Sequence, residues 1–250
     1  MKNHLFNTKT LLSSLLATVV VLLSPACGHA SDPLTIVTVG DSTMAEYRPE
    51  DIKRGWGQVL GDYLDPSSKV INLALSGRST KTFFDSGNWQ KALAAKPDFV
   101  FIQFGHNDSH PKDKPESTDA DTDFMEYLRR YVKEAREAGG KPILVTPMHR
   151  LTFDKNTGKM TQELKPYADA MKRVAEETKA PVIDLYTLSG DVFGPMGESG
   201  VAGMTQSNTD RTHFTEKGAR IIAKLVAEAS KQIDPRLNKI GPTQDNAVQP

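Results

Sequence analysis

A serine hydroxyl follows directly on a β-branched run of the chain. Residues 35–39 (Thr-Ile-Val-Thr-Val) predict a short buried strand that ends at Gly40, so Ser42 would lie just past its carboxyl end. A serine hydroxyl is a weak nucleophile at neutral pH and needs a base, most often a histidine oriented by a carboxylate. Asp210 and His213 offer both groups three residues apart, before the last predicted helix. Together they indicate acyl transfer, although the pair alone could be a capping acid and a helix-entry histidine.

Acyl transfer also needs hydrogen-bond donors for the oxyanion of its tetrahedral intermediate, each worth about 3 kcal/mol of the barrier. Three candidates follow predicted strands: the backbone N–H of Ser42, the backbone N–H of Gly77 and the side-chain amide of Asn107. Each group also has an ordinary explanation. Asp41 and Ser42 could cap a helix, Gly77 could end a strand, and Asn107 could bond to its own loop.

Two titratable neighbours of these residues are expected to have structural roles. Asp41 is expected to support the turn that presents Ser42. His106 adjoins Asn107 and is a possible second base by position, but we expect it to shape that loop instead.

The segments that must position these groups alternate between strand and helix. Predicted strands cover residues 35–39, 70–75, 98–104, 142–146 and 181–185, and predicted helices cover about 55–64, 89–95, 124–138, 167–175 and 221–229. This alternation predicts an α/β fold, with a mostly parallel sheet and helices on both of its faces. Because every segment leaving a parallel strand emerges at the same edge, the long polar loops would share that edge with Ser42.

The first 30 residues have the three-part pattern of a secretory signal peptide. Lys2 and Lys9 precede the apolar segment 11–23, and a small-residue cleavage site ends at Ala30. The apolar segment is too short and too interrupted by serine to span a bilayer comfortably, so no stable membrane insertion is expected. Two alternatives stay open: an uncleaved N-terminal anchor, and lipid attachment at Cys27.

Cleavage after Ala30 would change the charge and the chemistry of the 250-residue chain. The formal net charge of zero would become −2 with the loss of two lysines, and Cys27, the only cysteine, would be removed. The mature protein could then form no disulfide and use no cysteine nucleophile. Its near-neutral charge argues against nucleic acid as a partner. Residues 31–234 would form one domain, followed by a polar tail over 235–250.

Four short blocks, in order, resemble those of the SGNH (GDSL-type) hydrolases. They are the nucleophile block at 40–43 (Gly-Asp-Ser-Thr), the glycine block at 76–79 (Ser-Gly-Arg-Ser), the asparagine block at 105–108 (Gly-His-Asn-Asp) and the Asp-x-x-His block at 210–213. The resemblance implies a flavodoxin-like, three-layer α/β/α sandwich around a five-stranded parallel sheet, with no metal and no cofactor.

The same resemblance implies a role for each block. Ser42 would be the nucleophile, His213 the general base and Asp210 its orienting acid. Gly77 and Asn107 would complete the oxyanion hole with Ser42.

Within that superfamily the blocks look most like those of the rhamnogalacturonan acetylesterases, together with residues 146–150 (Thr-Pro-Met-His-Arg). This resemblance implies an esterase that removes acetyl groups from a pectin backbone. With the signal-peptide pattern, we expect it to be exported, periplasmic or secreted, and to be a monomer. Arg78, His149 and Arg150 could then contact galacturonate carboxylates, or could be ordinary loop residues engaged in solvation or salt bridges. Two other functions remain open: a GDSL-type lipase or lysophospholipase, and a carbohydrate-binding protein without catalysis.

Overall fold

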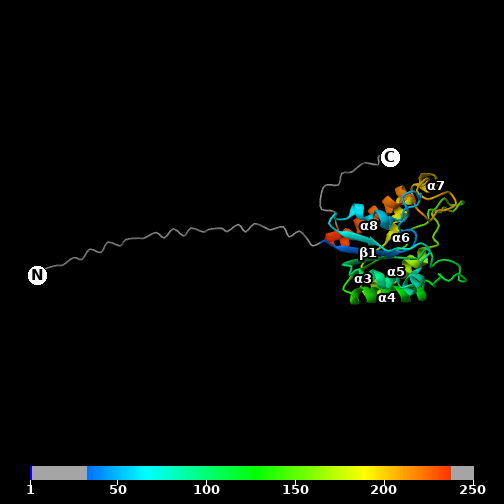
Figure 1. Ribbon diagram of the computed structural model, residues 1–250. Coiled ribbons are helices and arrows are strands. Elements are labelled where there is room, and N and C mark those ends of the chain that lie inside the picture. Colours follow the sequence, from blue (N-terminus) through cyan, green and yellow to red (C-terminus); the bar gives the residue numbers. More distant parts are fainter. Residues whose placement is uncertain (2–32, 238–250) are drawn as a thin grey trace. The chain divides into compact units, whose positions relative to one another are not determined.

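Five parallel strands form one sheet in the order β2-β1-β3-β4-β5 (Figure 1). The computed structural model describes Met1 and residues 33–237. The strands are β1 (Thr35–Gly40), β2 (Lys69–Asn72), β3 (Phe99–Gln103), β4 (Lys141–Val145) and β5 (Val182–Ile183). The chain moves from β1 to β2 on one side and then to β3 on the other, so the strand order reverses between β1 and β3. Open α/β sheets bind ligands outside the carboxyl ends of the strands at such a reversal.

Helices cover both faces of this sheet, which confirms the predicted α/β/α sandwich. Figure 1 shows α6 and α8 on one side and α3, α4 and α5 on the other. The first layer consists of α1 (Trp56–Val59), the 3₁₀-helix η1 (Leu60–Tyr63), α6 (Leu185–Phe193) and α8 (Glu216–Ile233). The second consists of α2 (Thr80–Asp85), α3 (Asn88–Ala94), α4 (Asp123–Glu137) and α5 (Lys165–Thr178). The short α7 (Gly197–Gly200) lies between α6 and α8 in the chain.

Alternating strand residues supply the two hydrophobic layers. Ile36 of β1 packs with the layer that contains α8, whereas its neighbours Val37 and Val39 pack with the layer that contains α4 and α5. All three side chains are fully buried, and each such burial contributes about 1.5–3 kcal/mol relative to exposure. The sheet is therefore anchored on both faces, and its carboxyl edge is a rigid platform for loops.

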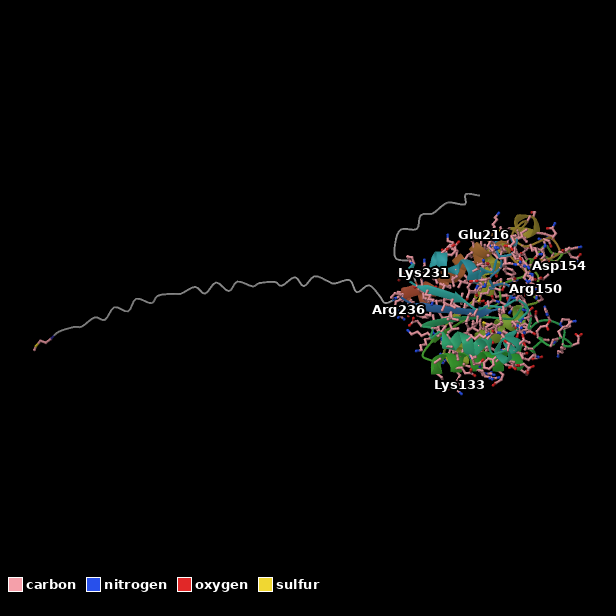
Figure 2. The ribbon with its side chains drawn as sticks, viewed as in Figure 1. Lys133, Arg150, Asp154, Glu216, Lys231 and Arg236 are labelled. Atoms are coloured by element: carbon pink, nitrogen blue, oxygen red, sulfur yellow. The ribbon has the colours of Figure 1, made fainter. Side chains whose placement is uncertain are left out.

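The loops on that edge come from distant parts of the chain. Figure 2 shows Arg150 and Asp154, from the segment after β4, at the opposite end of the sheet from Arg236. Glu216 of α8 and Lys133 of α4 lie on opposite sides of it. Ser42 follows β1 on the carboxyl edge, and the long polar loops after β3 and β4 share this edge, as the alternation of elements predicts.

Helices α2 and α6, like the short α7, have no counterpart in the sequence prediction. Helix α2 begins with a capping box in which Ser79 and Thr82 bond to each other's backbone N–H groups. Helix α6 begins directly after β5 because the side chain of Asp184 accepts a hydrogen bond from the Thr187 N–H. In both α2 and α6, capping hydrogen bonds define where the helix begins. Neither helix has a long repeating pattern of apolar residues, so hydrophobic periodicity could not predict them.

The domain extends past the predicted boundary at 234. Pro235–Leu237 forms the 3₁₀-helix η2, and Leu237 is fully buried in the hydrophobic cluster beside α8. The predicted signal peptide, with Cys27, and the predicted tail beyond 237 lie outside the described residues. Within the described part of the chain, no helix combines the length and apolar character needed to cross a bilayer.

A buried carboxyl group, Asp108, ties two of the edge loops together. Its oxygens accept hydrogen bonds from the N–H and O–H of Thr80 at the start of α2, from the Thr118 hydroxyl and from the Gly105 N–H. Burial raises the pKa of Asp108 to about 6, although the bonds from Thr80 and Thr118 act in the opposite direction. The glycine and asparagine blocks are thus held together by a group that titrates near neutrality.

We therefore expect the Asp108→Asn variant to change how stability depends on pH. A carboxyl whose pKa is raised on folding stabilises the protein fully below its unfolded value of 3.8, and this contribution is lost as pH rises through about 6. The advantage of the original protein over Asp108→Asn should shrink by up to about 3 kcal/mol between pH 4 and pH 7, measured by urea unfolding. An advantage that stays constant or grows with pH contradicts this assignment.

Candidate active site

Ser42 lies in a tight turn directly after β1. Gly40 makes this turn possible, because a Cβ at that position would lie 2.6 Å from the backbone oxygen of Gln103 on β3. The Asp41 carbonyl accepts hydrogen bonds from the N–H groups of Met44 and Ala45 and closes the turn. Ser42 is 6% exposed, so the residue is almost entirely buried within the site.

His213 and Asp210 form a hydrogen-bonded chain that ends at the serine. The His213 Nε2 lies 2.8 Å from the Ser42 Oγ, and its Nδ1 lies 2.7 Å from Asp210 Oδ2. The other carboxylate oxygen of Asp210 accepts the backbone N–H groups of Thr212 and His213, both at 3.1 Å. These bonds bend residues 210–213 into a turn that places the Asp210 carboxylate behind the His213 ring, and the ring reaches Ser42.

The ionisation of Asp210 fits an orienting role. Burial opposes its negative charge, but hydrogen bonds from the His213 ring and from the His213 and Thr212 backbone outweigh burial and lower the pKa of Asp210. An ionised Asp210 accepts the Nδ1 proton of His213, which leaves Nε2 free to accept the Ser42 proton. This is the tautomer that a general base requires.

The expected oxyanion donors belong to the same cluster of loops. The Asn107 amide donates to the carbonyl of Arg78 at 2.9 Å, which joins the asparagine block to the glycine block and leaves its second N–H available. Gly77 has a φ of +76°, a conformation that favours glycine. Within the described residues, the backbone N–H groups of Ser42 and Gly77 donate no hydrogen bond to the protein.

Tyr47 holds the serine turn against the glycine block, a contact that the sequence analysis missed. Its hydroxyl donates to the Ser42 carbonyl at 2.8 Å and lies 3.3 Å from the Ser76 Oγ. Burial raises the pKa of Tyr47, so the phenol stays protonated and available as a donor. A tyrosine in a polar loop gives no sequence signal for this role.

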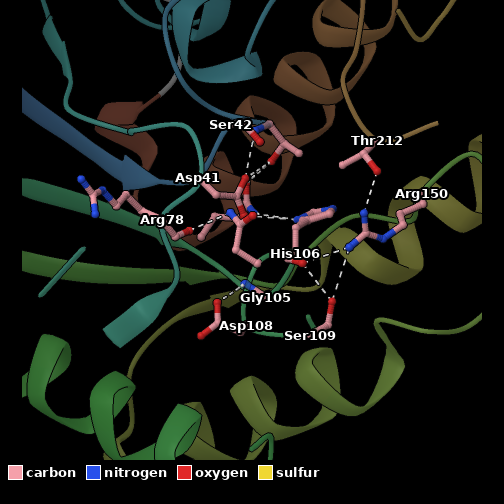
Figure 3. A network of polar contacts seen from close by, with 12 residues as sticks. Asp41, Ser42, Arg78, Gly105, His106, Asp108, Ser109, Arg150 and Thr212 are labelled. Atoms are coloured by element: carbon pink, nitrogen blue, oxygen red, sulfur yellow. Dashed lines mark hydrogen bonds and ion pairs between the residues drawn. The ribbon is translucent and has the colours of Figure 1, made fainter. Parts of the chain in front are cut away.

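Buried polar residues under the serine turn confirm the structural roles expected for Asp41 and His106. Asp41 accepts hydrogen bonds from the Thr43 N–H at 2.9 Å and from the Gln103 amide at 3.3 Å, and its Oδ2 lies 3.3 Å from the His106 Nδ1 (Figure 3). Burial lowers the pKa of His106, so this imidazole is neutral, and its Nδ1 lies beside both Asp41 and the Gln103 amide. Burial opposes the charge of Asp41, but its bonds to His106 and Thr43 hold the pKa of that carboxyl below its usual range.

Gln103 is a second site residue that the sequence analysis missed. It is the last residue of β3, fully buried, and its side-chain oxygen accepts hydrogen bonds from the Trp56 indole and the Thr43 hydroxyl, both at 3.0 Å. A polar side chain ending an otherwise apolar strand is the signal that could have indicated it.

The three residues expected at the substrate have different surroundings. The guanidinium of Arg78 makes no hydrogen bond or ion pair within the described part of the chain. His149 is buried and hydrogen-bonded to the Thr161 carbonyl. Arg150 already has protein partners, so it corresponds to the salt-bridging alternative, and its Nε lies 3.8 Å from Glu163.

Comparison with known proteins identifies the family. The family model described as GDSL-like lipase/acylhydrolase matches residues 38–221, which include all four blocks. The chain belongs to this family. It is a carboxylic ester hydrolase.

Two relatives from Bacillus subtilis are similar over most of their length. The chain is 40% identical to the probable rhamnogalacturonan acetylesterase YesY, over 79% of this chain and 93% of the relative. It is 37% identical to the rhamnogalacturonan acetylesterase RhgT, over 80% of this chain and 91% of the relative.

Two solved structures agree on the fold. Protein YxiM of Bacillus subtilis superposes with a TM-score of 0.72 and 29% identity, over 80% of this chain and 57% of that one. The acetylxylan esterase Axe2 of Geobacillus stearothermophilus superposes with a TM-score of 0.62 and 22% identity, over 78% of this chain and 93% of that one. The second likeness shows the fold alone.

Arg150 connects the two loops that carry Asn107 and His213. Its Nη1 donates to the Thr212 Oγ1 at 2.6 Å, one residue before His213. Its Nη2 donates to the carbonyl of His106 at 3.0 Å, one residue before Asn107. Figure 3 shows the guanidinium between these loops. A single side chain therefore fixes the loop of Asn107 against the loop of His213.

We expect Arg150→Ala to lower kcat for a small aryl acetate by up to about 100-fold with little change in KM, because a misplacement of about 1 Å between reacting groups has effects of this size. Arg136→Ala is the matched control. Arg136, in the last turn of α4, also donates to two backbone carbonyls, those of Thr178 and Lys179 at the C-terminal end of α5. Equal kinetics for both variants, at unchanged Tm, would contradict a positioning role for Arg150.

Proposed function

We propose that this protein is a serine esterase that removes O-acetyl groups from a plant cell-wall polysaccharide, with acetylated rhamnogalacturonan as its main substrate. The observation that supports the chemistry best is the 2.8 Å contact between Ser42 Oγ and His213 Nε2, with Asp210 bonded behind the ring. The substrate class rests on the relatives, two of which carry the name rhamnogalacturonan acetylesterase at 37–40% identity.

The proposed first half-reaction forms an acetyl-enzyme. His213 accepts the hydroxyl proton of Ser42 as Oγ attacks the acetyl carbonyl carbon. The negative charge on the carbonyl oxygen is stabilised by the N–H groups of Ser42 and Gly77 and by the Asn107 amide. The intermediate then collapses, the sugar oxygen leaves with the proton that His213 had taken, and the acetyl group stays on Ser42.

The second half-reaction returns the enzyme to its starting state. His213 takes a proton from water as the water oxygen attacks the acetyl carbon, and the same donors hold the oxyanion. Collapse releases acetic acid, which ionises to acetate at neutral pH, and the Ser42 oxygen recovers its proton from His213. Asp210 stays ionised throughout and stabilises the imidazolium that forms in each half-reaction.

A lipase would need an apolar channel for its acyl chain. Among the described residues of the domain, the exposed large hydrophobic side chains come from three separate segments of the chain: Ile52, Leu75 and Met196. Isolated exposed hydrophobics of this kind do not form an acyl-binding surface. The third function class, binding without catalysis, is disfavoured because the serine, imidazole and carboxylate are all present in hydrogen-bonded register.

Export to the periplasm or to the medium is part of the proposal. A polysaccharide substrate is met outside the cytoplasm, and residues 1–30 carry the signal-peptide pattern. We also propose that the mature enzyme acts as a monomer and binds neither nucleic acid nor a bilayer.

Release of acetate from acetylated rhamnogalacturonan, homogalacturonan and xylan tests this function. We expect the highest kcat/KM on rhamnogalacturonan, with losses of about 10⁶-fold in Ser42→Ala and about 10⁴-fold in Asp210→Asn. Asp113→Asn is the control, since Asp113 is an exposed acid with no side-chain partner among the described residues, and it should leave the rates unchanged.

Two outcomes would contradict the proposal. Near-normal turnover in Ser42→Ala would rule out Ser42 as the nucleophile. The lipase function would be favoured if the protein hydrolysed nitrophenyl octanoate faster than nitrophenyl acetate and released no acetate from any polysaccharide.

A further inference from the structure

A cavity of about 270 Å³ opens beside the loop that follows β4. Its walls include His149 from the exit of β4, Met160 and Gln162 from the long loop, and the glycines Gly190 and Gly194 from α6 and its C-terminal end. None of these residues takes part in the proposed chemistry at Ser42. Ligand pockets of proteins start at about this size, and one sugar ring is a small ligand.

His149 presents a hydrogen-bond acceptor to this cavity. Its Nδ1 lies 3.1 Å from the Thr161 carbonyl, so Nδ1 carries the proton and Nε2 keeps its lone pair. The ring is stacked on Tyr186 at 3.9 Å, and the His149 backbone N–H is bonded to the Ser189 hydroxyl. The imidazole is therefore fixed in orientation and tautomer before any ligand binds.

This state of His149 differs from the role expected from the sequence. Burial lowers the pKa of His149, so the ring is neutral near pH 7. A neutral ring whose free nitrogen is an acceptor does not attract a carboxylate, which is itself an acceptor. It accepts a hydrogen bond from a hydroxyl group, and sugars carry such groups on every residue.

Gly190 keeps that acceptor open. A Cβ at this position would lie 3.1 Å from the His149 Nε2 and would cover it. Alanine is otherwise the better residue inside a helix, by about 1 kcal/mol. Gly190 in the middle of α6 therefore makes the helix less stable than alanine would, but it leaves the His149 Nε2 accessible.

The cavity lies on the same sheet edge as Ser42. His149 follows β4 and Ser42 follows β1, and only β3 separates these two strands. Two inter-strand spacings are about 10 Å, a distance comparable to one or two sugar units. The segment that carries His149 is also bonded to the segment of the base, because the Leu151 N–H donates to the Arg211 carbonyl at 2.8 Å.

We propose that this cavity is a subsite for one sugar residue of the substrate backbone, whose hydroxyl group donates to the His149 Nε2 while an acetyl ester farther along the same chain reaches Ser42. The inference rests on the proposed polysaccharide substrate and names a part of the protein that binds it. In this subsite His149 recognises a sugar hydroxyl group, and Gly190 leaves the His149 Nε2 uncovered so that the contact can form.

The test compares a small ester with a long substrate in two variants. Gly190→Ala covers the Nε2. His149→Asn keeps an amide N–H for the Thr161 carbonyl, but its shorter side chain places no acceptor at the position of Nε2. The loss of one neutral hydrogen bond should raise KM for acetylated rhamnogalacturonan oligosaccharides about 3- to 10-fold, with kcat and the kinetics on nitrophenyl acetate unchanged. Gly61→Ala is the matched control, because a Cβ there has only ordinary contact, at 3.7 Å from a Val70 methyl group.

Binding without turnover gives a second measurement. In a Ser42→Ala background, calorimetric titration with the same oligosaccharides should show a weaker Kd by the same factor when Gly190→Ala is added. An unchanged KM and Kd in both variants would overturn the subsite, and so would a parallel loss on nitrophenyl acetate. If the unaltered protein releases no acetate from any polysaccharide, the proposed function itself fails, which is a separate result.

Discussion

The hydrogen bond between Ser42 and His213 joins residues 171 positions apart and depends on the whole sheet. Ser42 lies at the end of β1, and His213 precedes α8, which packs on one face of the same sheet. A change of about 1 Å between these elements would break the 2.8 Å contact and with it the means of activating the hydroxyl. Burial of strand residues on both faces supplies the rigidity that this distance requires.

Polar groups inside the protein then fix the loops on this platform. Asp41, Gln103 and His106 bond to one another below the serine turn, and Asp108 bonds the loop after β3 to the start of α2. Buried polar groups destabilise a fold unless they find partners, and satisfied networks hold one arrangement. The site is therefore positioned by the hydrogen bonds of these buried polar groups and by those of Arg150 to the loops of Asn107 and His213.

The sequence predicted the parts of the protein that are governed by local pattern. The apolar run at 35–39, the turn at Gly40 and the Asp-x-x-His spacing led to the strand, the serine and the base, because each depends on residues close together in the chain. Tyr47 and Gln103 were missed because their partners come from other segments. His149 was predicted near the substrate, but its tautomer depends on Thr161, which only the folded loop brings to its ring.

Covalent labelling of Ser42 tests the central claim most directly. A fluorophosphonate reacts with a serine whose hydroxyl is activated by a neighbouring base. Mass spectrometry of the digested protein should find one modified residue, Ser42, with labelling that parallels the loss of esterase activity and that is slow in His213→Ala. An active protein that remains unlabelled at Ser42, or that loses activity through a label on another residue, would contradict the account.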